Sequence, residues 1–141
     1  MRTRLAVMFS ILAAISLGRV LPAWAHHAFA AEFDEKKPVN LRGKVTKVEF
    51  INPHCWIHLD VKDEKGVVTN WAVEGGTPNT LFRAGFTKNS LPEGTEIVVD
   101  GYKARDGSNR AVGNNLTFPD GRRLFLGGTG DKRPEQAGSV Q

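Results

Sequence analysis

The sequence contains one cysteine, Cys55, among its 141 residues. A single cysteine has no partner within the chain, so a disulfide framework is excluded and the fold must depend on packing. The chain also has no internal repeat, no apolar run of the roughly 20 residues that span a bilayer, and no glycine-rich phosphate loop with its lysine. These absences argue against a disulfide-stapled domain, a repeat protein and a nucleotide-binding protein.

The longest apolar run has the length and flanks of a secretory signal peptide. Arginines at positions 2 and 4 precede the run from Leu5 to Leu17, and Ala23-Trp24-Ala25 supplies the small residues that signal peptidases require. We therefore predict a signal peptide over residues 1–25. A cut after Ala23 is less favoured because Leu21 would occupy a position that prefers a small side chain, and a retained membrane anchor is the second alternative.

The basic charge of the chain belongs mostly to this leader. Three of its 19 Lys and Arg residues lie in the predicted signal, which leaves 16 basic residues against 15 acidic ones. Nucleic-acid binding requires a basic stripe, which the mature chain lacks, so we predict no nucleic-acid partner. The remaining length is sufficient for one domain with a single core.

Three strands are expected first. Apolar and polar residues alternate over residues 39–50, 54–61 and 67–74, and a one-residue slip at Lys47 indicates a β-bulge. In the second strand the apolar face holds Cys55 and its alternate neighbours, and the opposite face is polar and aromatic. The three strands are expected to form a meander.

A short helix is expected after the third strand. Thr77 can cap it, Pro78 suits its first position, and Gly85 can close it, with Leu81 and Phe82 facing inward. A helix between the third and fourth strands is typical of the oligonucleotide/oligosaccharide-binding (OB) architecture.

Further strands are expected over residues 96–102 and in a hairpin over residues 115–126. We predict a mainly β fold: a small five- to six-stranded OB-like barrel over residues 39–127, with a small β-sandwich or roll as the alternative. Residues 26–38 are expected to form an irregular N-terminal arm. Residues 128–141 have the composition of a disordered tail.

The four histidines lie in two short clusters, His26-His27 directly after the predicted cleavage site and His54 and His58 on the second strand. Cleavage would make His26 the first residue, whose free α-amine and Nδ1 atom can chelate one metal ion when both are deprotonated. Residues four apart on a strand are separated by about 13 Å at roughly 3.3 Å per residue, so only one of the strand histidines can join that ion. We expect His54, because a turn precedes it.

The predicted site thus comprises the amine and imidazole of His26 with His54, completed by His27 or by a carboxylate such as Glu32 or Asp34. Copper(II) prefers tetragonal nitrogen and oxygen ligands, so copper is the expected cofactor. A tetrahedral zinc site is the open alternative.

Each of these residues also has an ordinary structural interpretation. His54 can cap a turn or donate to a backbone carbonyl, and His58 is expected to be a solvated strand residue. Cys55 is expected to be a buried small hydrophobe with a raised pKa.

Trp56 and Trp71 offer a different kind of site. Exposed aromatic rings can bind sugars, bases or peptides, so the two could form a binding platform on the outer face. Packing beneath the N-terminal arm is the structural alternative.

The sequence offers no catalytic constellation. It contains no spacing typical of a serine-histidine-acid set or a carboxylate pair, and Glu74, Arg83, Asp100 and Arg105 are scattered charges. A copper oxygenase is the remaining enzymatic alternative. It would need an open coordination position and a substrate surface, and only Tyr102 is available as an axial tyrosine.

Several motifs resemble an uncharacterised family of small exported bacterial proteins, a domain of unknown function, and the resemblance covers nearly the whole mature chain. The resemblance implies a periplasmic or secreted protein and supplies no activity, substrate or cofactor. The motifs that carry it are His26-His27-Ala28-Phe29-Ala30-Ala31-Glu32-Phe33-Asp34, Asn52-Pro53-His54-x-Trp56, Trp71-Ala72-x-Glu74, Thr77-Pro78-Asn79, Ala104-Arg105-Asp106-Gly107 and Asp120-Gly121-Arg122-x-Leu124-Phe125.

Two functions are expected from these observations. The first is an exported, non-enzymatic binding protein that holds copper through its mature N-terminal histidine. The second is a metal-free module that binds a protein, peptide or glycan through its tryptophans or a sheet edge. A periplasmic protein partner is compatible with both.

Overall fold

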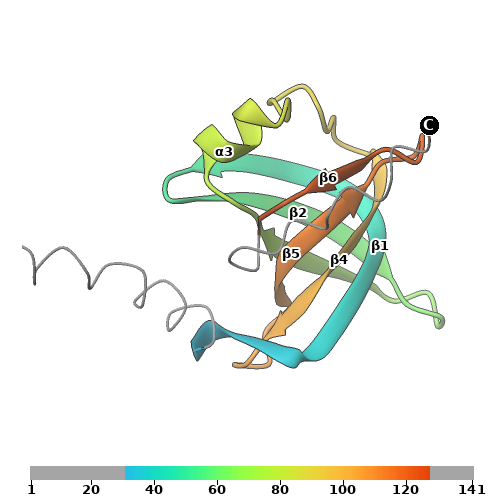
Figure 1. Cartoon of the computed structure of the whole chain (residues 1–141). Coiled ribbons are helices and arrows are strands. Elements are labelled where there is room, and N and C mark those ends of the chain that lie inside the picture. The colour runs from blue at the N-terminus through green and yellow to red at the C-terminus, as the bar shows by residue number, and fades with distance from the viewer. Residues whose placement is uncertain (1–30, 128–141) are drawn as a thin grey trace, which may run out of the picture.

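The computed structural model describes residues 31–127 (Figure 1). The predicted tail, residues 128–141, lies outside this range. Most of the described residues belong to strands. The elements are β1 (Phe33–Ile51), β2 (His54–Lys62), β3 (Val68–Glu74), α3 (Pro78–Arg83), β4 (Glu96–Ala104), β5 (Arg110–Thr117) and β6 (Arg123–Phe125).

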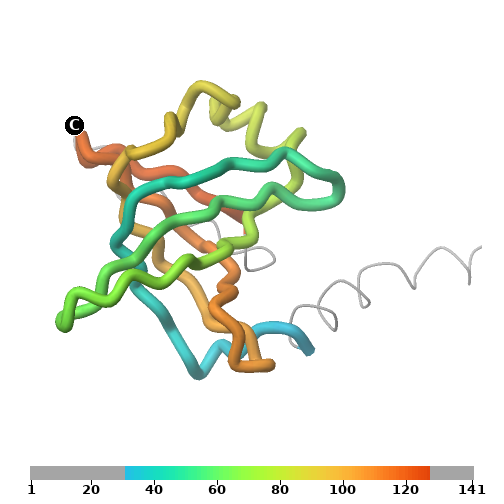
Figure 2. Tube along the Cα trace, turned by 180° about the vertical axis from the view of Figure 1, so that it is seen from behind, coloured from blue at the N-terminus to red at the C-terminus, as the bar shows by residue number. Residues whose placement is uncertain are grey.

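The strands form one sheet in the order β3-β2-β1-β4-β5-β6, with antiparallel neighbours throughout. β3 also pairs in parallel with β5, through Val73 and Ala111 and the residue pairs on either side. This extra pairing joins the first and fifth strands of that order, β3 and β5, so β1 to β5 close into a ring (Figures 1 and 2). The prediction of a mainly β fold with a short helix between the third and fourth strands is confirmed.

The interior of the ring is the hydrophobic core. The burial pattern of β2 shows how alternate residues form this core. Cys55, Ile57 and Leu59 are fully buried, while the residues between them are only partly buried. This alternation with a period of two is expected of a strand with one face against a core. The other strands contribute in the same way, with Val45, Val73, Val99 and Leu116 among the core residues.

β1 contains the expected irregularity and one difference from expectation. Its register with β2 shifts between Val45 and Lys47, which confirms the predicted bulge. The strand begins at Phe33 and not at Val39. Phe33 is buried against Ala104, the last residue of β4, and pairs with it in the β1–β4 register. The last six residues of the expected irregular arm are therefore part of β1.

α3 lies at one end of the ring, above the hairpin that joins β1 and β2 (Figure 1). The Thr77 side chain accepts a hydrogen bond from the Thr80 N–H, and Gly85 follows the helix with a φ of 82°, a value that favours glycine. Leu81 is buried as expected. Phe82 is not, since it is 43% exposed and stacks on Phe50 with ring centroids 5.0 Å apart.

β5 begins at Arg110, five residues before the expected start. Its central residues Gly113, Asn114 and Asn115 have little intrinsic preference for strands, so the sequence pattern is hidden there. Pairing with β4 on one side and with β3 and β6 on the other makes the segment a strand regardless. The expected hairpin return is confirmed as β6. Over residues 31–127 no helix combines the length and the apolar character that crossing a membrane requires.

Candidate functional site

His54 is the first residue of β2 and lies beside the last residue of β3. The two strand ends are tied by backbone hydrogen bonds, since the Cys55 N–H donates to the Gly76 carbonyl at 2.9 Å and the Gly75 N–H to the Cys55 carbonyl at 2.8 Å. Glu74 is directly opposite Trp56 in the β2–β3 register. Side chains of residues 54, 56 and 74 therefore share the outer face of the sheet.

The His54 ring is held through one nitrogen. Its Nδ1 atom lies 2.7 Å from Glu74 Oε1 and 3.3 Å from the carbonyl oxygen of Gly75. Within residues 31–127 no partner contacts its Nε2 atom, and the side chain is 44% exposed. Nδ1 is therefore held by two acceptors, whereas Nε2 has no hydrogen-bond partner in this part of the chain.

The Glu74 carboxylate is the most deeply buried charged group of the described chain, with a side chain 12% exposed. Burial raises the pKa of Glu74 because the charged form loses water, and the nearby Glu32 carboxylate raises it further. Electrostatic interactions with His54 and Arg110 lower the pKa of Glu74. The net pKa remains above the usual value of 4.5.

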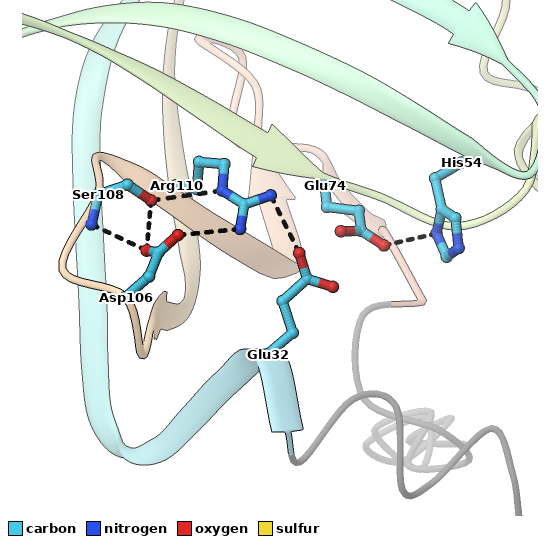
Figure 3. A network of polar contacts seen from close by, with 6 residues as sticks. All are labelled: Glu32, His54, Glu74, Asp106, Ser108 and Arg110. Carbon is cyan, nitrogen blue, oxygen red and sulfur yellow. Dashed lines mark hydrogen bonds and ion pairs between the residues drawn. The ribbon is translucent and has the colours of Figure 1, made fainter.

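A second polar network lies beside this pair (Figure 3). Arg110 donates to Glu32 Oε1 at 3.0 Å and to Asp106 Oδ2 at 3.3 Å. The Ser108 hydroxyl also contacts both Asp106 and Arg110. Figure 3 shows Glu74 between the Glu32–Arg110 pair and His54, so the described start of the chain reaches the same region.

The start of the chain is fixed there by its backbone as well. The Arg105 N–H donates to the Glu32 carbonyl at 2.9 Å, and Arg105 Nε donates to the Phe33 carbonyl at 3.0 Å. The buried Phe33 ring adds an apolar anchor. The described start of the chain is therefore held beside the end of β4 by polar and apolar contacts.

Of the predicted metal ligands, the structure places only His54 at the site. His26 and His27 lie outside the described residues, whereas His54 lies at the site. Glu32 pairs with Arg110, and Asp34 lies 3.8 Å from Arg105. Of the carboxylates expected near His54, neither contacts it. Among residues 31–127 there is no group of three His, Cys, Asp or Glu side chains arranged to hold a metal ion.

The two tryptophans do not share a surface. Trp71 pairs with Leu59, which faces the core, and packs against the core cluster with Lys103 Nζ 5.6 Å from its ring centroid. Trp56 lies on the opposite, outer face, in register with Glu74. The predicted platform of both rings therefore does not form.

Two further expectations concern β2. His58 is not simply solvated, because its Nε2 atom lies 2.8 Å from Glu49 Oε2 and its side chain is only 26% exposed. The hydrogen bonds from Lys47 and His58 lower the pKa of Glu49. Cys55 is buried as expected, and burial raises the pKa of its thiol to about 11.

Sequence reasoning missed Glu74 and Arg110 as members of the site and treated Glu74 as a scattered charge. A signal was present in the Trp71-Ala72-x-Glu74 motif, where the acidic residue ends an otherwise apolar and uncharged strand segment. Arg110 carried no comparable signal, because its role depends on the parallel β3–β5 pairing.

A model of a family of unknown function, DUF6152, matches residues 14–114. The chain belongs to this family. The match includes the predicted N-terminal histidines together with His54, Glu74 and Arg110, and it ends within β5. No curated protein and no solved structure matches the chain.

Proposed function

We propose that this DUF6152 protein is an exported, non-enzymatic binding protein that holds copper(II) between its mature N-terminal histidine, His26, and His54. The proposal depends mainly on the contacts that the two ring nitrogens of His54 make. Its Nδ1 atom contacts Glu74 Oε1 and the Gly75 carbonyl oxygen, whereas its Nε2 atom has no hydrogen-bond partner among residues 31–127. Histidines that ligate metals commonly donate their second ring N–H to a carboxylate or carbonyl in this way.

The anchoring of Glu32 supports the participation of His26. Glu32 lies close enough to Glu74 to influence its ionisation, and Glu74 contacts His54. His26 precedes Glu32 by six positions. An extended chain covers at most about 3.3–3.6 Å per residue, so the reach is roughly 20 Å. The length of this segment therefore permits a ligand on His26 to extend to His54.

Copper(II) is favoured over zinc by the donors proposed. An amine and two imidazoles suit a tetragonal ion, and nitrogen sites of this kind bind copper(II) more tightly than other divalent first-row metals. The same proposal includes signal cleavage after Ala25 and a periplasmic location. It also includes an OB-like barrel for the closed ring, supported by the position of α3 between β3 and β4.

The test is copper(II) titration of protein purified from the periplasm, with its first residue determined by intact mass. We expect one equivalent to bind to protein that begins at His26. His54→Ala should weaken the affinity at least tenfold, because a ring-nitrogen ligand is lost. His58→Ala is the matched control, since it removes the other β2 histidine, whose Nε2 atom is bonded to Glu49.

Equal affinities for the wild type and His54→Ala would refute the proposal. So would a mature protein that begins at another residue and still binds copper with the same affinity. In either case the metal-free interaction module would become the preferred function.

A further inference from the structure

His54 and His58 use opposite ring nitrogens, which makes their environments directly comparable. At His54 two acceptors, the Glu74 carboxylate and the Gly75 carbonyl, lie next to Nδ1. The carbonyl can only accept a hydrogen bond, so the arrangement requires the proton on Nδ1. The lone pair of the neutral ring is then on Nε2.

At His58 the carboxylate of Glu49 contacts Nε2 instead. The neutral His58 ring with its proton on Nε2 carries its lone pair on Nδ1. The two histidines on one strand are therefore expected to be opposite tautomers, each selected by a glutamate on a neighbouring strand.

We infer that Glu74 is the positioning residue of the His54 site: with the Gly75 carbonyl it fixes the ring as the Nδ1–H tautomer and presents Nε2 as the ligating atom. This inference rests on the proposed function for the identity of the ligand. It differs from that function because it assigns a second residue and a particular nitrogen.

The geometry gives Glu74 this role for three reasons. Its Oε1 atom is 2.7 Å from Nδ1, its side chain is 12% exposed, and its backbone is fixed by the pairing of β3 with both β2 and β5. A carboxylate held on a paired strand restricts ring rotation more than one on a loop. The Gly75 carbonyl adds a second contact to the same nitrogen.

The first measurement is a long-range proton–nitrogen NMR spectrum of the metal-free mature protein at neutral pH. We expect His54 as the Nδ1–H tautomer and His58 as the Nε2–H tautomer. A wild-type spectrum with His54 mainly in the Nε2–H form would overturn the inference without any variant.

The second measurement compares Glu74→Gln with Glu49→Gln in the same spectrum and in copper(II) titration. Glu74→Gln should mix the His54 tautomers, because an amide can donate as well as accept, and should weaken copper binding about 10–100-fold. Glu49→Gln should alter only His58 and leave the copper affinity within about twofold, below the range expected for a lost outer partner.

The outcomes separate the two claims. If the wild type binds copper through His54 but Glu74→Gln changes neither tautomer nor affinity, the positioning role is wrong and the proposed function stands. If Glu74→Gln changes the tautomer but the wild type binds no copper, the orientation by Glu74 is supported and copper binding is refuted. A weaker affinity with an unchanged tautomer would also overturn the inference.

Discussion

On the outer face of β2, each histidine contacts a glutamate carboxylate of a neighbouring strand. Glu74 of β3 forms an ion-pair contact with His54 at 2.7 Å, and Glu49 of β1 is hydrogen-bonded to His58 at 2.8 Å. The two carboxylates differ because of burial: the pKa of the buried Glu74 is raised by desolvation, whereas the more accessible Glu49 has its pKa lowered by hydrogen bonds from Lys47 and His58. The same pair of residue types thus behaves differently in two environments.

Glu49 leads to a pH prediction. Its pKa is lower in the folded state than its ordinary value of 4.5, so its ionised form favours folding. The wild type should be more stable than Glu49→Gln above about pH 4.5, and this difference should disappear as the pH falls through the lowered pKa. Urea unfolding at several pH values measures it.

The control is Glu93→Gln, at an exposed position in the turn before β4. It removes an exposed carboxylate for which no hydrogen bond or ion pair is found among residues 31–127, and so serves as the matched variant for the loss of one acidic side chain. A difference in unfolding free energy between the wild type and Glu49→Gln that stayed constant from pH 7 to pH 3 would contradict the lowered pKa of Glu49.

The strands are held in place by close backbone approaches as well as by side-chain packing. β4 and β5 pair through Gly101 and Gly113 at a register shift. A Cβ atom on Gly101 would collide with the carbonyl oxygen of Val112. Glycine is therefore required here by the distance between backbones and not by its φ angle.

Gly101→Ala should lower the free energy of unfolding by about 1–3 kcal/mol, because the strands must separate to accept the methyl group. Gly75→Ala is the matched control, since its nearest neighbour would be the Cys55 carbonyl oxygen at 3.6 Å, an ordinary contact. Chemical denaturation of both variants gives the comparison. Equal stabilities would show that the β4–β5 pairing tolerates a side chain at this position.

At the scale of the whole molecule, the proposed metal site would connect the first residue of the mature chain to the closed ring. A ligand that binds only the folded protein stabilises it by about 2.7 kcal/mol at one hundred times its dissociation constant. We therefore expect copper(II) to raise the melting temperature of protein that begins at His26, and a chelator to reverse the effect.

Acetylation of the α-amine of His26 gives the corresponding control. The acetylated nitrogen no longer offers a lone pair to the ion, so the copper-dependent rise should be much smaller. Calorimetry with and without copper measures both proteins. An equal rise in the two proteins would show that the ion does not use the N-terminal amine of His26.

Much of the fold could be predicted from local patterns. The alternation in β2 identified its buried face, the slip at Lys47 identified the bulge, and Thr77 with Pro78 identified the start of α3. Each of these depends on the periodicity or backbone preference of neighbouring residues, which is a local property. The strand-poor sequence around Gly113 lacked such a pattern, so the start of β5 was missed.

What the sequence determined by itself was the set of strands, their apolar faces and the helix cap, because residues within a few positions of each other decide these features. Only the tertiary structure decided that β3 pairs with β5, that Trp56 and Trp71 lie on opposite faces, and that Glu74 contacts His54. These features depend on the register between strands, which is set by packing of the whole ring and by contacts between residues distant in the chain.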